Sequence, residues 1–417
     1  MAKGDRSFSG GPKPVQRIEL TDKHKTLRII LLAVTILIAV IAFTTGLTEL
    51  LYTKPGWQNI ESTADGRHCG QDFTFMYYLG AGEMSPTEEN RALTKLYSQA
   101  TQRAYRLFSV DEASGDGIYG VNAHPNEVVT VDPALYAAFE QVQAWKNRNL
   151  YLAPVYVEYN RVFLYEDEQE AMRYDPTRDP ELLQYVAELA AFANDPNSID
   201  LELLGNNQVR LNISEAYLAY AQENALDKYV DFGMMKNAFI VDVMAQILQD
   251  NGFTRGYIAS YDGFNRNLDT SGEKYTFNIY DRYQNEIYLP AAMEYTQPAS
   301  IVFLRNYPMS QIDRWNYYSF SDGKILTTMI DPADGISKSA TDNLVAYSAS
   351  DGCAEILLRV SSVYIADALD EEALKNLTQD GIYSVWFEGT TLKYLDKNMS
   401  LMMAQVDGLA YQAQLVD

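Results

Sequence analysis

An uncharged apolar run near the N-terminus is the strongest constraint on how this 417-residue chain folds. The run, Ile29–Leu47, reads IILLAVTILIAVIAFTTGL and contains no charged side chain. As a helix it would extend over about 28 Å, roughly the thickness of the hydrocarbon core of a bilayer. It is long for the apolar part of a signal peptide, and no convincing cleavage site follows it. We therefore predict a transmembrane signal anchor over residues 29–48, with a cleaved signal peptide as the alternative.

The charges on either side of the run predict its orientation. Lys23, Lys25 and Arg28 come just before it, and Glu49 follows it. By the positive-inside rule, the N-terminus stays in the cytoplasm and the bulk of the chain is exported but held at the cell membrane. The first residues, with paired glycines and scattered prolines, are typical of a disordered tail. The predicted parts are a cytoplasmic disordered tail (1–28), the anchor (29–48), a stalk (49–72) and an extracytoplasmic domain (73–417).

The charge of the exported part limits its partners. The whole chain carries a net charge of −23, while residues 1–28 carry seven Lys/Arg and three Asp/Glu, so the rest carries −27. Such an acidic surface disfavours nucleic acid and anionic lipid, because few cations are present to release phosphate counterions. A hydrophobic content of 47% nevertheless suffices for a large core. We predict a soluble domain that does not bind nucleic acid.

Cysteine and histidine are too scarce for several kinds of site. The two cysteines, Cys69 and Cys353, form no CxxC motif, which argues against a zinc cluster or a thioredoxin-type motif. They are compatible with one disulfide or with two separate buried thiols. His24, His68 and His124 are the only histidines, and His24 precedes the apolar run. A Ser-His-Asp triad or a histidine-rich metal centre is therefore not expected.

Helix and strand signals alternate through the exported domain. Helices are predicted to start at the capping box Ser85–Glu88, at Asp132-Pro133 and at Asp179-Pro180, and to cover 236–250 and 351–366. Runs rich in β-branched and aromatic residues predict strands at 256–261, 275–280, 300–305 and 343–348, and a hairpin of 383–388 with 391–396 that turns at Gly389. The predicted fold class is α+β (mixed α/β).

One segment has the properties of an anion site. Residues 231–242, DFGMMKNAFIVD, lead from a turn into a helix, with Asp231 and Gly233 before the first turn and Lys236 within it. The free N–H groups and positive dipole end of a helix N-terminus suit phosphate, and a lysine there adds a cationic contact. The structural alternative is an aspartate that caps the helix and a solvated lysine.

The order of motifs along the chain adds a family resemblance. After the helix come a strand ending in Tyr261-Asp262-Gly263, the segment MIDPADG (329–335), a strand and the helix CAEILLRVSSVY (353–364). This succession resembles the ApbE-type FAD:protein FMN transferase family over residues 73–398. Members typically show D-x-G-x-x-K-G-x-x-x-D, a glycine-pair turn, H-x-x-D-P-x-T-G and a late A-D-A-x-x-T helix. The resemblance implies an ApbE-like flavin transferase fold, FAD or FMN as cofactor, and Mg²⁺-dependent transfer of FMN to a Ser/Thr hydroxyl of another protein.

The residues agree with these motifs in part. Matching positions are Asp231, Gly233, Lys236, Asp242, Gly263, Asp331, Pro332 and Gly335. Departures are Asn237 and Asp262 for glycines, Thr328 for the histidine, and Asp334 for the threonine. The resemblance implies catalytic roles for Asp331 and Lys236. It implies cofactor binding by Asp231, Gly233, Lys236, Asp242, Gly263, Thr328, Asp331 and Arg359.

The last helix departs from the family at its metal ligands. The alignment of best length puts Glu355 at the metal-binding aspartate and Arg359 at the metal-binding threonine; another register would use Asp367 with Glu371. Glu355 keeps a carboxylate and is the candidate metal ligand. A guanidinium cannot ligate a cation, so Arg359 would occupy the place of the ion. Metal-dependent transfer is therefore expected to be weak or absent, unless Glu355 and Arg359 are only a surface pair.

Three functions are compatible with the sequence. The first is a degenerate member of the family that is tethered to the membrane and binds flavin, a partner protein, or both. The second is an active FMN transferase that modifies exported redox proteins at the membrane surface. The third is a tethered binding or scaffold module of the cell envelope that does not use flavin. Arg359 in place of threonine favours the first function over the second.

Overall fold

A computed structural model describes residues 25–63 and 72–416 and separates the chain into two compact units, residues 1–54 and 55–417. In the first unit, α1 (Lys25–Leu51) includes the whole apolar run. Within the described residues, no helix combines the length and apolarity required to cross a bilayer. The anchor over 29–48 therefore stays a prediction. Most of the predicted tail, and Cys69, lie outside the described residues.

The second unit, residues 55–417, contains the remaining helices. The α-helices are α2 (Pro86–Phe108), α3 (Ile118–Ala123), α4 (Pro133–Ala144), α5 (Ala153–Leu164), α6 (Glu168–Met172), α7 (Pro180–Asn194), α8 (Glu215–Glu223), α9 (Lys236–Asp250), α10 (Cys353–Tyr364) and α11 (Glu371–Leu377). Short 3₁₀ turns are η1 (Arg148–Tyr151), η2 (Gly233–Met235), η3 (Gln311–Trp315) and η4 (Thr378–Asp380).

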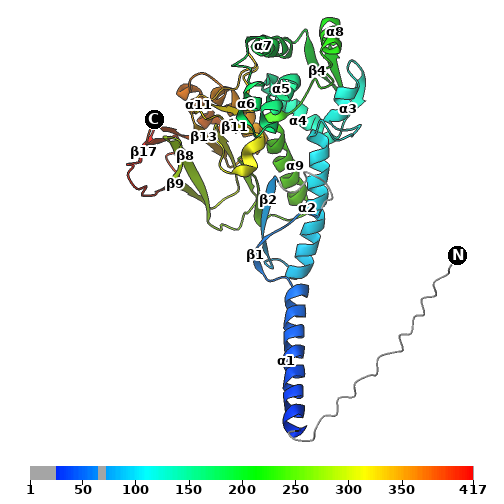
Figure 1. Cartoon of the computed structure of the whole chain (residues 1–417), viewed down its shortest axis with the longest axis vertical. Helices are drawn as coiled ribbons and strands as arrows, with labels where there is room; N and C mark the ends of the chain where they lie inside the picture. Colours follow the sequence, from blue (N-terminus) through cyan, green and yellow to red (C-terminus); the bar gives the residue numbers. More distant parts are fainter. Residues whose placement is uncertain (1–24, 64–71, 417) are drawn as a thin grey trace, which may run out of the picture. The chain divides into compact units, whose positions relative to one another are not determined.

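A nine-stranded sheet forms the centre of this unit (Figure 1). Its order is β1 (Gly56–Asn59), β2 (Phe73–Leu79), β6 (Gly256–Ser260), β7 (Phe264–Asn267), β10 (Ala299–Arg305), β13 (Asn343–Ser348), β14 (Tyr383–Glu388), β15 (Thr391–Tyr394) and β17 (Gln412–Leu415). Neighbouring strands are antiparallel except for the parallel pair β15 and β17. The mixed α+β class predicted from the sequence is confirmed.

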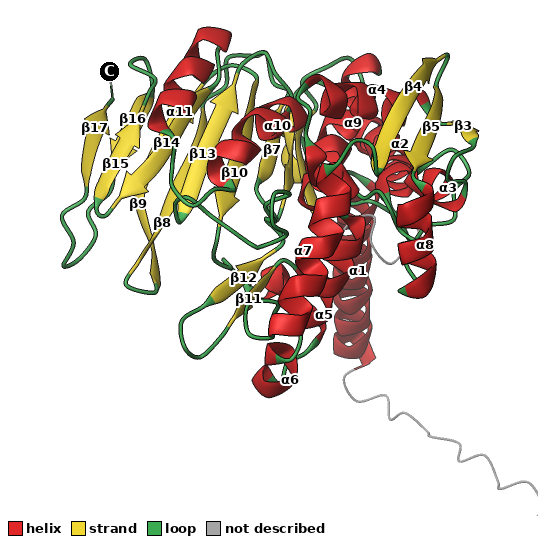
Figure 2. Cartoon of the chain, turned by 90° about the horizontal axis from the view of Figure 1, so that it is seen from above, coloured by secondary structure: helices red, strands yellow, loops and turns green. Residues whose placement is uncertain are grey.

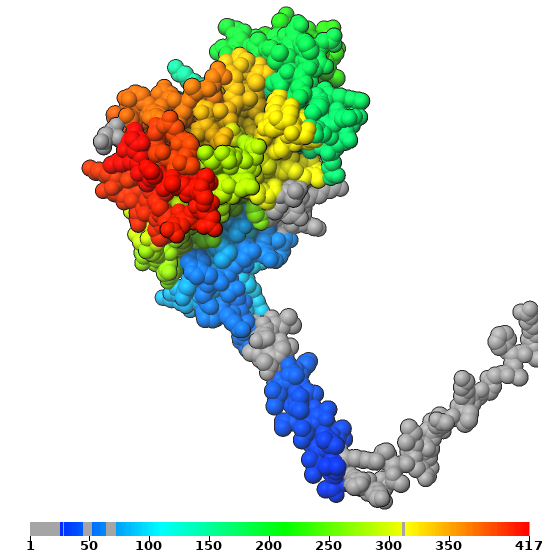
Figure 3. Space-filling model, turned by 60° about the vertical axis from the view of Figure 1, so that its left-hand side comes forward, coloured from blue at the N-terminus to red at the C-terminus, as the bar shows by residue number. Residues whose placement is uncertain are grey.

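Three smaller sheets accompany the central one. They are β16 (Ser400–Met403) with β9 (Glu286–Tyr295) and β8 (Tyr275–Tyr283); β3 (Val128–Thr130) with β5 (Gln208–Ile213) and β4 (Ile199–Gly205); and β11 (Tyr317–Ser319) with β12 (Ile325–Thr327). Figure 3 shows the C-terminal segment, in red, on the surface beside the yellow-green segment that contains β8 and β9.

Both faces of the central sheet are covered, and strand β10 shows how. All seven of its residues are buried. Val302 and Leu304 belong to the main core, where α10 packs on β10 and β13, whereas Ile301 and Phe303 belong to a second core with residues of β8 and β9. Because side chains alternate between the faces of a strand, a strand buried on both faces is apolar over most of its length; in β10 only Ser300 and Arg305 are polar. Figure 2 shows α10 and α11 lying across one face of these strands.

The helix starts predicted from capping signals are confirmed. The Ser85 hydroxyl accepts a hydrogen bond from the Glu88 N–H, and the Glu88 carboxylate accepts one from the Ser85 N–H, which makes the capping box. The helix predicted over 236–250 has these bounds. The helix predicted over 351–366 is shorter, because α10 begins at Cys353, where a carboxylate from another helix caps it.

The stalk predicted over 49–72 is not a uniform linker. Gly56–Asn59 forms β1, which pairs with β2 at the edge of the central sheet. Trp57 packs edge-on against Tyr78 and Tyr275, with ring centroids 5.6 and 5.8 Å away. This aromatic contact explains why a short, partly polar segment belongs to the folded unit.

Candidate functional site

The turn before α9 holds the first group of predicted site residues. The backbone N–H of Asp231 donates to the Leu150 carbonyl (2.8 Å), and its carboxylate accepts from the Gly233 N–H (2.9 Å). Burial is the main reason why the pKa of Asp231 is raised. Gly233 has φ +50°, and a Cβ there would lie 2.3 Å from the ring of Tyr156. The turn therefore requires glycine.

Lys236 is the first residue of α9 and is half-buried. Its ammonium lies 5.2 Å from the centroid of the Tyr105 ring, a cation–π distance. The predicted cation at this helix N-terminus therefore lies against an aromatic face of α2.

Asp242 has a structural contact that the sequence did not predict. Its two carboxylate oxygens accept hydrogen bonds from the N–H groups of Cys353 (3.0 Å) and Ala354 (2.8 Å), which are the first residues of α10. A Cβ on Gly352 would lie 2.4 Å from Asp242 Oδ2, so only glycine leaves room for the carboxylate. Asp242 thus caps α10 from α9 and fixes the two helices to each other.

Gly263 lies in the turn between β6 and β7. Its φ is +114°, and its carbonyl accepts a hydrogen bond from the Phe303 N–H of β10 (2.8 Å). Next to it, Asp262 Oδ2 accepts from the Asn237 amide of α9 (2.9 Å), which joins this turn to the α9 N-terminus. The pKa of Asp262 is raised, chiefly by burial.

The segment after β12 contains Thr328 and Asp331. Thr328 is half-buried directly after the strand. Asp331 starts a tight turn in which its side chain accepts from the Ala333 N–H (2.9 Å). Its second oxygen is 2.8 Å from the ammonium of Lys338, which also lies 2.7 Å from Asp334. Hydrogen bonds to these two aspartates raise the pKa of Lys338, so its charge is retained.

Arg359 and Glu355 lie on α10 and share a tryptophan. The Trp145 indole N–H donates to Glu355 Oε1 (2.8 Å), and the Arg359 guanidinium lies 4.7 Å from the centroid of the Trp145 ring. Arg359 also forms an ion pair with Asp380, and its side chain is only 9% exposed. It is therefore not a solvated surface charge. Burial is the largest cause of the raised pKa of Glu355, although the Trp145 bond and Arg359 oppose it.

Residues 145–150, which the sequence did not predict to be part of the site, bring most of these groups together. Residues 145–150, between α4 and α5, contact three of the predicted motifs. Trp145 bonds Glu355, Asn147 bonds Ser361 (3.2 Å), Asn149 bonds the Ile330 carbonyl (2.8 Å), and the Leu150 carbonyl accepts from Asp231. The α9 N-terminus, the Asp331 turn and α10 therefore meet around the 145–150 segment. Gly263 joins them less directly, through Asn237.

The residues at this site do not fit Mg²⁺. Among the described residues, no group of three or more His, Cys, Asp or Glu side chains is arranged to hold a metal ion. A cation already lies beside each candidate carboxylate, Lys338 next to Asp331 and Arg359 one turn from Glu355. Magnesium needs several oxygen ligands in octahedral array, whereas at both places a side-chain cation lies beside the carboxylate that would be one of them.

The same site has polar atoms that would suit a polar organic ligand. Asn237 Oδ1, Asp262 Oδ1 and Arg359 Nε are buried and have no hydrogen-bond partner within the described part of the chain. Buried polar groups are normally paired, so unpaired ones are candidates for ligand contacts. Flavin, with its amide-like ring edge and its phosphates, carries groups that could pair with them.

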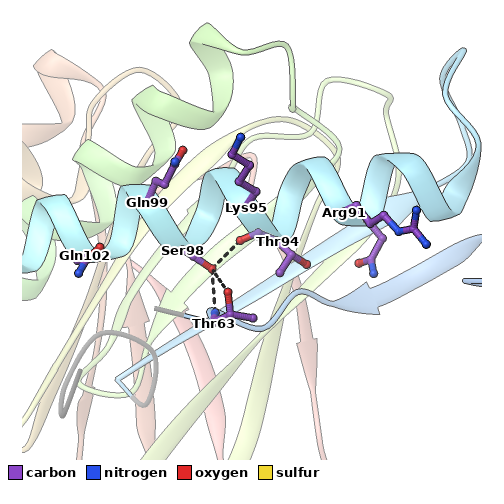
Figure 4. A pocket seen from close by; sticks show the side chains of 8 residues that line it. Thr63, Arg91, Thr94, Lys95, Ser98, Gln99 and Gln102 are labelled. Carbon is purple, nitrogen blue, oxygen red and sulfur yellow. Dashed lines mark hydrogen bonds between the residues drawn. The ribbon is translucent and has the colours of Figure 1, made fainter. Parts of the chain in front are cut away.

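One surface pocket of about 690 Å³ lies elsewhere, along α2 (Figure 4). Its lining is polar: Thr63, Asn90, Arg91, Thr94, Lys95, Ser98, Gln99 and Gln102. The Thr63 N–H donates to Ser98 Oγ (2.8 Å), which donates to the Thr94 carbonyl (2.6 Å). None of the predicted site residues lines this pocket, so it is separate from the candidate site.

Solved structures provide the comparison with known proteins. The chain resembles the ApbE protein of Thermotoga maritima (TM-score 0.53, 11% identity, covering 84% of this chain and 97% of that one). It also resembles the flavin transferase ApbE from Vibrio cholerae (TM-score 0.54, 12% identity, covering 84% and 98%). No protein-family model and no curated protein matches the sequence. At such low identity the likeness establishes the fold, and the resemblance inferred from the motifs is confirmed at that level.

Proposed function

We propose that this chain is an ApbE-like flavin-binding protein in which metal-dependent FMN transfer is weak or absent. The proposal includes a tether to the cell membrane through residues 29–48, with the domain outside the cytoplasm. The ApbE-like fold supports a role connected with flavin. The buried polar atoms without partners around α9 and α10 support a ligand at the place where the motifs meet.

The position of Arg359 is the observation that most strongly supports the proposed loss of metal dependence. Its guanidinium is held between Trp145 and Asp380, one helical turn from Glu355, and is almost fully buried. A divalent ion next to Glu355 would face this fixed positive charge, and like charges at a few ångströms repel strongly in a partly buried site.

Side-chain cations offer an alternative to the metal for holding a pyrophosphate. Lys338 is fixed by Asp331 and Asp334, Arg359 by Trp145 and Asp380, and Lys236 opens α9. Arginine and lysine bind phosphate oxygens through charge-assisted hydrogen bonds. In this proposal they bind and orient the ligand, and the flavin supplies its own redox chemistry when bound.

We expect the full chain to quench FAD fluorescence on titration without a requirement for Mg²⁺, and to release no AMP from FAD with Mg²⁺ and a flavin-acceptor peptide. The double variant Arg359→Thr/Glu355→Asp should make FAD binding Mg²⁺-dependent, because it removes the cation and restores a shorter carboxylate. Arg173→Thr/Glu170→Asp is the matched control: it makes the same changes in an exposed ion pair of α6 and its C-cap, and should have no effect.

Two results would contradict this proposal in different ways. Robust Mg²⁺-dependent release of AMP by the unmodified chain would favour an active transferase that modifies exported redox proteins. Failure to bind FAD or FMN would leave only a binding or scaffold role, in which a partner protein is recognised without flavin.

The membrane tether is tested separately. We expect the full chain to remain in the membrane fraction after extraction with alkaline carbonate, because an apolar helix is not released by high pH. A chain starting at Pro55, the first residue of the second compact unit, should be released. Release of the full chain under these conditions would contradict the anchor, and a shortened mature N-terminus would indicate a cleaved signal peptide.

A further inference from the structure

A second cavity, of about 300 Å³, lies between α5, α7 and the segment that follows α8. Figures 1 and 2 both draw α5 beside α7, and the two helices are in contact. This volume is at the small end of the range for ligand pockets. No residue predicted for the flavin site lines the cavity, so what it binds is independent of the proposed function.

The most unusual group in the cavity wall is Glu158 of α5. Its side chain is 5% exposed, and Oε2 accepts a hydrogen bond from Arg161 Nη1 (2.8 Å), one turn along the same helix. Arg161 is 51% exposed, so much of its charge is screened by water. A half-solvated partner offsets only part of the desolvation free energy of a buried carboxylate, so the buried charge of Glu158 destabilises the fold. Burial accordingly raises the pKa of Glu158.

The other charges around the cavity leave it negative. Asp227 contributes a second carboxylate, which is exposed. Lys228 also lines the cavity, but it is paired with Asp111 outside it. Counting Glu158 with Arg161 and Lys228 with Asp111 as neutral pairs leaves the charge of Asp227. The field inside the cavity therefore favours a cation.

The remaining walls suit a short apolar body. Val157 and Leu226 contribute aliphatic surface, and Tyr185 of α7 is half-buried in the wall. The negative charge of Glu158 contributes to the raised pKa of Tyr185, after burial, which places the phenol near the carboxylate. An aromatic ring beside a carboxylate is an environment that binds ammonium groups.

The loop that closes the cavity is fixed in place. After α8, Ala225 has φ +54°, and the Leu226 N–H donates back to the Ala221 carbonyl (2.8 Å). This is the helix-ending turn that normally has glycine at the left-handed position. Leu226 and Asp227 are thus presented to the cavity by a defined turn.

We propose that this cavity binds a small ligand with a primary ammonium group on a short apolar chain. The ammonium pairs with the Glu158 carboxylate and is supported by Asp227, while the chain contacts Val157, Leu226 and Tyr185. A carboxylate ligand would instead have to compete with Glu158 for Arg161 or with Asp111 for Lys228.

The test uses pentylamine, pentanol and pentanoate as probes, titrated into the full chain and followed by ligand-detected NMR. Pentylamine should bind at least about tenfold more tightly than pentanol, because it alone offers a charged donor to Glu158. Glu158→Gln should remove this preference. Asp227→Asn, at the exposed rim, should weaken pentylamine about two- to fivefold. Glu223→Gln, at an exposed glutamate of α8 outside the lining, is the matched control and should leave binding unchanged.

Three results would overturn the proposal: equal binding of pentylamine and pentanol, tighter binding of pentanoate, or equal losses in Glu158→Gln and Glu223→Gln. Thermal unfolding shows whether Glu158→Gln folds. If it does not, the proposal is still tested by the preference for pentylamine over pentanol in the unmodified chain and by the weaker binding expected in Asp227→Asn. Flavin is absent from every arm, so failure here would not bear on flavin binding.

Discussion

Replacing Gly263 with alanine is expected to lower the free energy of unfolding of the domain by about 2–5 kcal/mol. The backbone at Gly263 has φ +114°, a conformation that L-residues with a side chain rarely adopt, and an added Cβ would lie 2.3 Å from the carbonyl oxygen of Phe303. That oxygen cannot move away easily, because the Phe303 N–H is itself bonded to the Gly263 carbonyl. Urea unfolding of the full chain would measure the loss.

Gly272 provides the control for this substitution. It also has a left-handed φ, +81°, but a Cβ there would meet no atom within 4 Å. Gly272→Ala should therefore cost only the conformational penalty, about 1–2 kcal/mol. Equal losses at Gly263 and Gly272 would show that the close approach to β10 is not what requires glycine in the β6–β7 turn.

Local signals made several elements predictable from sequence. The helices α2, α4 and α7 begin where a capping side chain is followed by proline, and the three caps bond the first turns as expected. Strand β10 was predictable because its centre, residues 301–304, is an apolar run rich in β-branched and aromatic residues. Strand β1 was not predicted, because it is stabilised by pairing with β2 and by the contacts of Trp57. The four residues of β1 contain no sequence signal for either contact.

The candidate site was less predictable, because its contacts join residues far apart in the chain. Trp145 and Glu355 are 210 residues apart, and Asn149 and Ile330 are 181 apart. Asparagine side chains that bond distant carbonyls leave no periodic pattern, so the 145–150 segment resembled an ordinary loop. The match to the family motif implies cofactor binding by Asp242, which stays a prediction. The sequence did not predict that its carboxylate reaches the start of α10, 111 residues away.

The second large effect is expected for Arg305→Leu, which should destabilise the domain by about 3–5 kcal/mol. Arg305 is 2% exposed, and its Nη2 donates to Asp313 Oδ1 (3.0 Å) and to the Tyr261 carbonyl (3.1 Å). Asp313 is 4% exposed, so the substitution would leave a buried carboxylate without its cation. Thermal unfolding of the full chain measures the cost.

Arg314→Leu separates the effect of burial from the effect of removing an arginine. Arg314 pairs with Glu166 at 3.2 Å, but the two side chains are 45% and 86% exposed, so the loss should stay below about 1 kcal/mol. The double variant Arg305→Leu/Asp313→Leu should recover part of the stability lost in Arg305→Leu, because it leaves no buried charge unpaired. Recovery should be incomplete, since Asp313 also accepts from the N–H groups of Met309 and Ser310. If Arg305→Leu cost no more than Arg314→Leu, the Arg305–Asp313 pair would not be holding the Tyr261 carbonyl and the β6–β7 turn beside Asp262.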